Sequence, residues 1–327
     1  MTQAVRTSHA KTFLKATVTV GLLWWVFHKA NVIAALDQIA RADWLWMALG
    51  VVLLLALVVP AAMRWGYVLR AMAIRVRFRA LLAWMLAASF FNQVLPSTMG
   101  GDVLRAEWCR RSGVSLGSSV SSILIDRLCA LAATILLCAA SLPIIVGVVT
   151  GHSALIAVLI PLAGAGALGG LLLPRRFGNA SRPWLRTIAE FSDQLASVLL
   201  DRRYGWLILL VSAMTHLIRI TAIWFLAIGL HIDVSFLVCV ALIPICLLIA
   251  TVPITFGGWG LREGIFVVAF SQAGVPSTDA LALSVSFGLA GIAAALPGAL
   301  AWQRLPSANA AMAPSPDRDE REEERRD

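Results

Sequence analysis

Residues 253–262 read P-I-T-F-G-G-W-G-L-R and lie between two apolar runs, so this stretch falls at or near the depth of a membrane. Residues 96–105 read P-S-T-M-G-G-D-V-L-R, and the two stretches align without a gap at an offset of 157 residues. Both fit the pattern P-x-T-x-G-G-x-x-L-R. Pro/Gly-interrupted apolar segments at matching places in two halves of a chain are typical of a transporter site built from broken helices. We therefore predict an internal repeat; the alternative is two unrelated turns at the membrane edge, where Pro and Gly are common.

The composition predicts a polytopic membrane protein. The chain is 59% hydrophobic and 14% charged, whereas soluble domains average about 45–50% and about 25%. Several nearly uncharged runs approach about twenty residues, the length that crosses a bilayer core. The net charge of +9 is expected to face the cytoplasm and anionic lipid headgroups, with no nucleic acid as a partner. The five cysteines form no C-x-x-C, so we interpret them as small buried hydrophobes.

The first predicted crossings are residues 12–27 and 44–63. A secretory signal is the alternative for the first of them, because that run is short. Five arginines follow the second crossing, from Arg64 to Arg79, without an acid among them. Such a loop is expected in the cytoplasm. The amino terminus, two crossings earlier, is then cytoplasmic as well.

Residues 80–113 are predicted to form a re-entrant hairpin. Their apolar part is about sixteen residues long, which is marginal for a full span. The later helices, at 119–149 and 153–173, lead into the arginine-rich loop 174–204, which must be cytoplasmic. Counting two crossings back from that loop, the segment enters and leaves on the cytoplasmic side and turns at Pro96. Non-helical backbone at this depth must line a protein or water cavity.

The second half repeats this order upside down. Residues 205–230 cross outward, residues 234–275 enter from outside and break at Pro253, and residues 280–302 cross inward. The predicted fold is an all-α polytopic membrane protein, an inverted repeat with two re-entrant broken-helix hairpins and about six full spans. Its parts are one transmembrane domain at 1–304 (repeats at about 44–150 and 205–302), an amphipathic loop helix at 183–200 on the inner membrane face or under the bundle, and a disordered cytoplasmic tail at 305–327.

The two breaks predict an anion site near the midplane. A new helix begins after each Gly-Gly turn, at about Asp102 and about Leu261, and the first N–H groups of a helix carry about half a positive charge. Arg105 and Arg262 lie in these first turns and can make forked bonds to a phosphate. The neighbouring acids, Asp102, Glu107 and Glu263, are open to three roles: pairing with the arginines, gating the site, or contacting an amine on the headgroup.

Asp126 and Arg127 form the other pair of intramembrane charges. Adjacent residues on a helix do not face each other, so each is expected to pair elsewhere, for instance Asp126 with Arg105. Buried ions are costly, which makes a functional role the default hypothesis; the alternative is a structural ion pair at the cytoplasmic interface. Asn92 either lines the cavity or satisfies backbone groups of the broken helix. Further candidates near the cavity are Arg64 and Arg219, whereas His216 fits better a packed, neutral histidine.

In combination, these motifs resemble a flippase-like membrane family. The motifs are N-x-x-L-P at 92–96, G-D-x-x-R at 101–105, D-R at 126–127 and P-x-T-x-G-G-x-G-x-R-E at 253–263. The family comprises the transmembrane region of lysylphosphatidylglycerol synthases and stand-alone UPF0104 relatives, and the likeness spans roughly residues 10–303. One departure is Phe256, where relatives often have Pro.

The resemblance implies a protein that moves, or helps to move, a lipid between leaflets. We expect an integral membrane lipid translocase of the bacterial cytoplasmic (inner) membrane, with both termini cytoplasmic. It would bind an anionic phosphate-containing headgroup between the two breaks. The expected partners are an anionic or zwitterionic phospholipid or a polyprenyl-phosphate lipid, with a separate lipid-modifying synthase as a candidate protein partner. Because no aminoacyl-transferase domain follows Trp302, lysyl transfer is not expected.

Two alternatives stay open: a membrane enzyme acting on a phospholipid or polyprenyl phosphate, and an accessory subunit of a lipid-modifying synthase. Such enzymes usually show a metal-binding acid cluster or a His/Asp nucleophile pair, so we predict no catalytic residue, metal or cofactor here. The candidate substrate-binding residues are Asn92, Pro96, Thr98, Gly100, Gly101, Asp102, Arg105, Asp126, Arg127, Pro253, Thr255, Gly257, Gly258, Gly260, Arg262 and Glu263.

Overall fold

The computed structural model describes residues 17, 19, 21–22, 24–26, 28–94, 100–148, 151–172, 183–251, 255, 259–305 and 311. Most of the predicted first crossing and of the carboxyl-terminal tail lie outside the described residues. So do five of the candidate site residues at the two turns, namely Pro96, Thr98, Pro253, Gly257 and Gly258.

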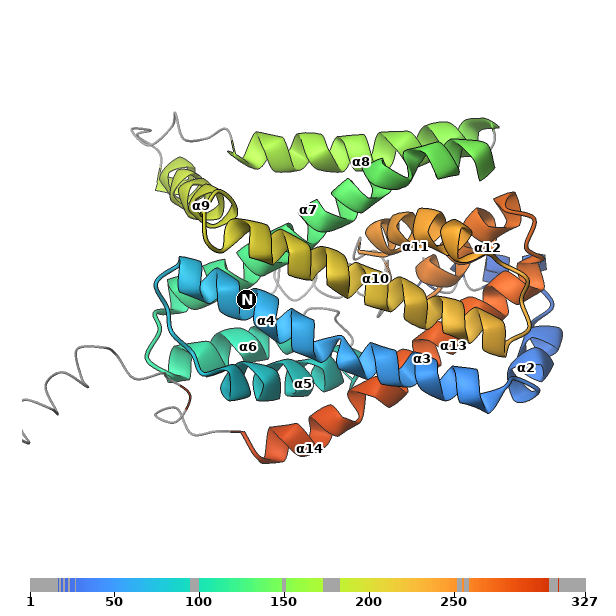
Figure 1. The fold of residues 1–327 in the computed structure, drawn as a ribbon, viewed down its shortest axis with the longest axis horizontal. Helices are drawn as coiled ribbons and strands as arrows, with labels where there is room; N and C mark the ends of the chain where they lie inside the picture. Colours follow the sequence, from blue (N-terminus) through green and yellow to red (C-terminus); the bar gives the residue numbers. More distant parts are fainter. Residues whose placement is uncertain are drawn as a thin grey trace, which may run out of the picture.

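The described elements form an all-helical bundle (Figure 1). In chain order they are α2 (Val32–Ala40), α3 (Trp44–Ala56), α4 (Val58–Ala71), α5 (Phe78–Val94), α6 (Gly100–Arg111), α7 (Leu116–Val148), α8 (Gly151–Leu172), α9 (Pro183–Leu199), α10 (Gly205–Gly229), α11 (Phe236–Ala250), α12 (Leu261–Gln272), α13 (Ser277–Ala295) and α14 (Pro297–Gln303).

Four helices of the described part are long and apolar enough to cross a bilayer, so the chain is a multi-pass membrane protein. They are Trp44–Ala71, Leu116–Val148, Gly205–Gly229 and Ser277–Gln303. The first and last of these contain a short break, at Leu57 and at Leu296. Prolines explain both breaks, because Pro60 and Pro297 lack the N–H that would donate to the carbonyl four residues earlier.

The second crossing is longer than predicted. The sequence suggested a helix that ends at residue 63 and a cytoplasmic loop that begins with Arg64, but α4 continues to Ala71. Arg64 is therefore a buried residue inside the helix, only 8% exposed. Trp65, Val68 and Leu69 beside it are fully buried, so the continued helix packs against the bundle on this face.

Two pairs of shorter helices lie in opposite halves of the molecule. α5 packs beside α6 in one half, and α11 packs against α12 in the other (Figure 1). The approach of α5 to α6 is close because residue 101 is a glycine: a Cβ there would lie 2.2 Å from the carbonyl oxygen of Ala88. The segments that would join the helices of each pair lie largely outside the described residues.

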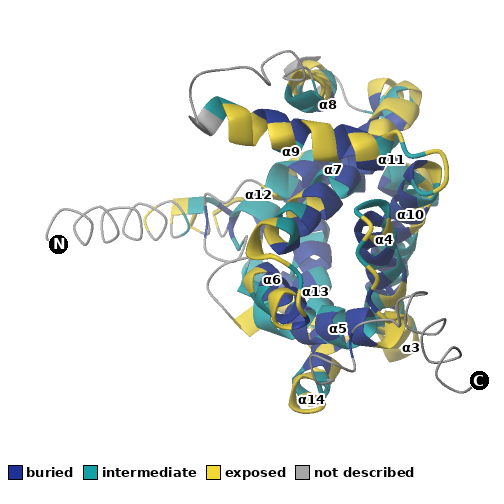
Figure 2. Ribbon diagram, turned by 90° about the vertical axis from the view of Figure 1, so that its left-hand side faces the viewer, coloured by how far each residue is buried: buried dark blue, intermediate teal, exposed yellow. Residues whose placement is uncertain are grey.

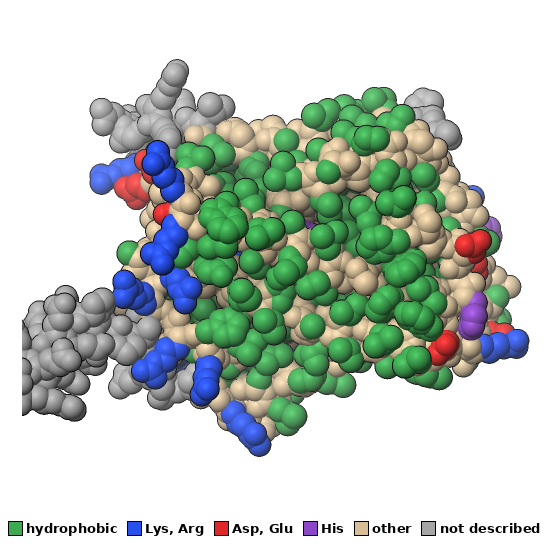
Figure 3. Space-filling view, in the orientation of Figure 1, with side chains coloured by type: hydrophobic (Ala, Val, Ile, Leu, Met, Phe, Trp, Pro, Cys, Tyr) green, Lys and Arg blue, Asp and Glu red, His purple; other side chains and the backbone are tan. Residues whose placement is uncertain are grey.

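Charged and apolar side chains occupy different parts of the molecular surface along its long axis. Figure 3 shows a broad hydrophobic surface, with Lys and Arg gathered at one end. This is the end where α4 and α6 finish and α10 begins (Figure 1). It carries Arg70, Arg75, Arg110, Arg111 and Arg203, and we refer to it as the basic end.

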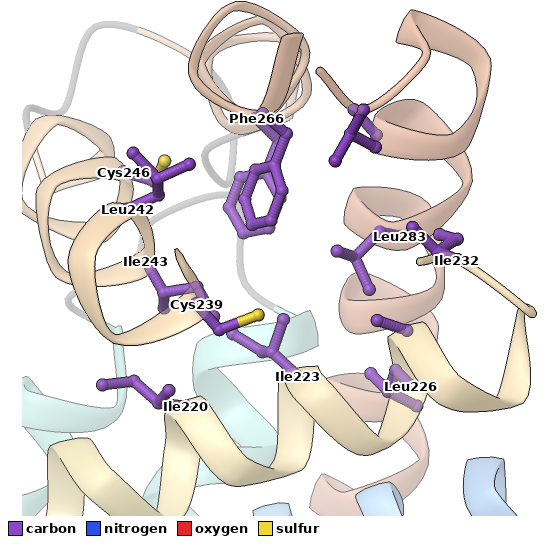
Figure 4. Close-up of a cluster of buried hydrophobic side chains, with 14 of the residues drawn as sticks. Ile220, Ile223, Leu226, Ile232, Cys239, Leu242, Ile243, Cys246, Phe266 and Leu283 are labelled. Atoms are coloured by element: carbon purple, nitrogen blue, oxygen red, sulfur yellow. The ribbon is translucent and has the colours of Figure 1, made fainter. Parts of the chain in front are cut away.

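The largest core joins α10, α11, α12 and α13. Phe266 lies among Ile223, Leu242 and Leu283 in this core (Figure 4). Figure 2 shows buried residues facing the centre of the bundle and exposed ones on its outside, as a lipid-facing surface requires. All five cysteines are buried free thiols, which confirms the prediction made for them.

Candidate functional site

A continuous chain of ion pairs, buried except at Arg127, connects α4, α6 and α7. Asp126 accepts hydrogen bonds from Arg64 Nε at Oδ1 (2.7 Å) and from Arg105 Nη2 at Oδ2 (3.0 Å). Arg105 also donates from Nη1 to Asp102 Oδ1 (3.0 Å). Asp102 Oδ2 in turn accepts from Arg127 Nε (2.8 Å). We call these five residues the charge network.

The positions of these residues along their helices explain the pairing. Asp102 and Arg105 are three residues apart on α6, a spacing that places side chains on one face. Asp126 and Arg127 are adjacent on α7, and each pairs with a different partner, as predicted. The predicted pair of Asp126 with Arg105 is present. Arg64 was expected near the cavity only as a secondary candidate, yet it makes the shortest bond to Asp126.

The charge network is buried at one end and exposed at the other. The Asp126 side chain is 1% exposed, whereas that of Arg127 is 47% exposed. The network therefore has a closed end at Arg64, which is bonded to Asp126, and an open end at Arg127.

A tryptophan supports the centre of the network. The guanidinium carbon of Arg105 lies 4.2 Å from the centre of the Trp65 ring, within the range of a cation–π contact. Trp65 is fully buried and donates from Nε1 to Ser122 Oγ (3.2 Å), which fixes the indole plane. Arg105 Nε is buried and has no hydrogen-bond partner among the residues that the structure describes.

The network carries more positive than negative charge. Arg219 on α10 lies within electrostatic range of Arg64 and Arg127, and no carboxylate among the described residues pairs with it. Residues 95–99, 252–254 and 256–258, which the structure does not describe, contain no acid either. Among the described residues, three arginines of the network share two aspartates, and Arg219 adds a fourth cation, so the group carries two more positive than negative charges.

In α12, the helix that follows the second break, a side chain of the first turn accepts a hydrogen bond from the backbone at the helix start. The Gly260 N–H donates to Glu263 Oε2 (2.6 Å), with Gly260 at φ 85°, a conformation that favours glycine. Arg262 donates to Glu263 Oε1 from Nη2 (2.6 Å) and Nε (3.0 Å). Its guanidinium also lies over the Trp259 ring, 4.7 Å from the centre. Thr255, between the two helices, is buried, and its hydroxyl has no partner in the described part of the chain.

The first break is closed in a similar way. α6 begins at Gly100, and the N–H of Gly101 donates to Asn92 Oδ1 (2.8 Å). Asn92 therefore satisfies a backbone group, one of the two roles predicted for it. The expectation of free helix starts was too simple, because the Gly101 and Gly260 N–H groups are both occupied by side chains. Asp102 and Glu263 take the first of the roles left open to them, pairing with arginines.

One face of helix α13 contacts residues that flank the two breaks. A Cβ at Gly288 would lie 2.4 Å from Arg262 Nη2, and a Cβ at Gly291 would lie 3.4 Å from the Gln93 amide nitrogen. These glycines are one turn apart on α13, so Arg262 and the end of α5 pack against neighbouring turns of that helix. Arg105 and Arg262 are not hydrogen-bonded to a common group: each pairs with acids of its own.

His216 belongs to the packing between α7 and α10. Its Nε2 lies 2.9 Å from Thr134 Oγ1 and 3.3 Å from the carbonyl oxygen of Ala130. The interpretation as a packed histidine fits this position. Within the described ranges, no group of three or more His, Cys, Asp or Glu side chains is arranged to hold a metal ion.

Comparison with known proteins adds two findings. The family described as "Lysylphosphatidylglycerol synthase TM region" matches residues 12–298. A "UPF0104 membrane protein" from Methanothermobacter thermautotrophicus is 25% identical over 280 residues, which cover 76% of this chain and 82% of the relative. The family match includes the charge network, both breaks and Arg219.

Proposed function

Because this chain belongs to the lysylphosphatidylglycerol synthase transmembrane-region family, we propose that it is a lipid translocase. It moves, or helps to move, a lipid with a phosphate-bearing headgroup between the two leaflets of a membrane. The headgroup binds at the open end of the charge network, between the two Pro/Gly-Gly breaks. Both the family and the multi-pass fold support a role linked to lipids.

The observation that carries this proposal is an excess of two positive charges among the described residues of the charge network and Arg219, which we place at membrane depth. An uncompensated ion in this environment is costly, and it is usually kept for a ligand or a pathway. A phosphate carries one or two negative charges and accepts forked hydrogen bonds from guanidinium groups. Arg127, which is half exposed, and Arg219, which has no acidic partner among the described residues, offer such donors.

The arrangement of the short helices supports movement between two faces. In this proposal α5 with α6, and α11 with α12, are the re-entrant hairpins of an inverted repeat, entered from opposite sides. The basic end faces the cytoplasm, because basic residues are retained on that side. The bonds from Gly101 to Asn92 and from Gly260 to Glu263 close the two helix starts, and a phosphate would compete for these N–H groups.

The experiment compares two arginine variants in proteoliposomes. Arg127→Gln removes a cation at the open end of the network, and Arg110→Gln removes an exposed cation on the surface of α6 as a matched control. The readout is the rate at which headgroup-labelled phosphatidylglycerol equilibrates between leaflets. We expect Arg127→Gln to slow this rate at least about tenfold, the effect of about 1.4 kcal/mol in a barrier, and Arg110→Gln to leave it unchanged.

Three other outcomes would contradict the proposal. Equal rates in the wild type and Arg127→Gln would remove the charge network from the pathway. Chemical change of the lipid by the purified protein, especially if a metal is needed, would favour a membrane enzyme. Equilibration no faster than in empty liposomes would favour an accessory subunit that acts only with a separate synthase.

A further inference from the structure

A second polar cavity lies at the basic end, away from the charge network. It occupies about 710 Å³ between the end of α4 and the start of α10. The polar side chains that line it are Tyr67, Arg70, Arg75, Arg203 and Tyr204. Arg70 follows Arg64 by six residues on α4, which is about 9 Å along the helix toward the basic end.

The chemistry of this cavity is suited to a phosphate. Three arginines line it, no acid does, and no carboxylate among the described residues forms an ion pair with them. The only two tyrosines of the chain meet here, with stacked rings 6.1 Å apart. The guanidinium of Arg70 lies over the Tyr67 ring (5.9 Å) and that of Arg203 over the Tyr204 ring (5.4 Å). The aromatic rings hold the cations in place, while their N–H groups are free to bind an anion.

The backbone on both sides of the cavity is fixed by local hydrogen bonds. On the α10 side, Asp201 Oδ1 accepts from the N–H groups of Arg203 (2.8 Å) and Tyr204 (2.6 Å). The Asp201 carboxylate thus accepts from the backbone and forms no ion pair with the cavity arginines among the described residues. On the α4 side, the chain turns through Ala73 at φ 60°, a left-handed conformation that favours glycine. Strained residues of this kind cluster at functional sites.

An apolar cavity adjoins the basic one. It measures about 260 Å³ and shares Tyr67 and Arg70 with its neighbour. Its other walls include Met63, Phe78 and Leu81, which belong to α4 and α5. A cationic compartment and an apolar compartment therefore meet at Tyr67 and Arg70. A free anion would use only the first of them, whereas a lipid would use both.

We propose that the two cavities form one binding site for an anionic phospholipid of the leaflet at the basic end. The headgroup phosphate binds to Arg70, Arg75 and Arg203, and the first part of an acyl chain packs against Met63, Phe78 and Leu81. This site is separate from the charge network. Binding to it is measured without transport, so it can fail or succeed independently of the translocase function.

The test is an equilibrium titration of the purified full chain in a neutral detergent with a fluorescent phosphatidylglycerol. The variant Arg70→Gln with Arg203→Gln removes two cations of the site. The control, Arg110→Gln with Arg111→Gln, removes two exposed cations of α6 at the same end of the molecule, so both variants have the same net charge. We expect at least a tenfold loss of affinity in the first variant and no change in the second. Equal affinity in the two variants would overturn the proposal.

Soluble competitors distinguish a lipid from a free anion. Inorganic phosphate and glycerophosphoglycerol, which lack acyl chains, are expected to displace the labelled lipid only at concentrations at least tenfold higher than unlabelled phosphatidylglycerol. Displacement at equal concentrations would overturn the assignment to a lipid. If the double Gln variant loses its folded transition, Arg70→Lys with Arg203→Lys tests the same site. We expect it to bind several-fold more weakly, since lysine cannot form a fork, and wild-type affinity in that variant would contradict the phosphate contacts.

Discussion

Asp126→Asn is expected to destabilise the protein strongly, since Asp126 is the counterion of two buried arginines. Its carboxylate binds Arg64 at 2.7 Å and Arg105 at 3.0 Å, and the three side chains are 9% exposed or less. Breaking a buried pair by removing one partner costs about 3–5 kcal/mol, because it leaves an uncompensated charge. The substitution also raises the positive excess of the network and Arg219 from two charges to three.

The companion variant is Arg64→Gln. Asp126 then keeps its bond to Arg105, so the expected loss is smaller, about 1–3 kcal/mol. The double variant Asp126→Asn with Arg64→Gln restores the excess of two charges. Its loss of stability should therefore be smaller than the sum of the two single losses, by about 0.5–3 kcal/mol.

The assay is equilibrium unfolding of each variant in detergent with increasing sodium dodecyl sulfate, followed by tryptophan fluorescence. Glu190→Gln is the control, because its pair with Arg186 on α9 is exposed and such pairs contribute little. A loss below about 1 kcal/mol for Asp126→Asn, or strictly additive losses in the double variant, would refute the buried network as an energetic unit.

Three other predictions follow from single positions. Gly101→Ala should cost about 1–3 kcal/mol of stability, since the new Cβ meets the α5 backbone and the two helices must separate; a variant as stable as the wild type would contradict the close approach. Gly288→Ala should displace the Arg262 guanidinium and slow lipid equilibration, with little change in the melting temperature; unchanged rates would remove this contact from the site. Hydrogen bonds from Arg110 and its neighbour lower the pKa of Glu107 to about 2, so the stability that Glu107→Gln removes should be present above pH 4.5 and disappear as the pH falls toward 2; a difference that is constant over this range would argue against those bonds.

The parts of the fold set by hydropathy could be predicted from the sequence. The long apolar runs at 119–149 and 205–230 became α7 and α10 with ends within a few residues of those expected. Arg64 was placed in a loop because an arginine after an apolar run resembles an interfacial residue. Only its partner Asp126, 62 residues away, shows why the helix continues through it.

Most residues of the candidate site could be predicted from the sequence, but most of the hydrogen bonds between them could not. The bond between Arg105 and Asp126 followed from the rule that adjacent residues on a helix face different ways. The closing of the second helix start by Glu263 had a sequence signal, a glycine followed three residues later by glutamate, which is a variant of the capping box. No sequence signal indicated the bond from Gly101 to Asn92 or the excess charge at Arg219, because each depends on how separate helices pack.

The central claim is that a lipid phosphate neutralises the excess charge of the network at membrane depth. The most direct measurement is an electron cryo-microscopy structure of the protein in nanodiscs that contain phosphatidylglycerol. The account predicts density for a phosphate within about 3.2 Å of a guanidinium nitrogen of Arg127, Arg105 or Arg219. Two results would contradict this claim: no headgroup density at the network in the lipid-saturated protein, or a network whose charge is neutralised by protein carboxylates alone.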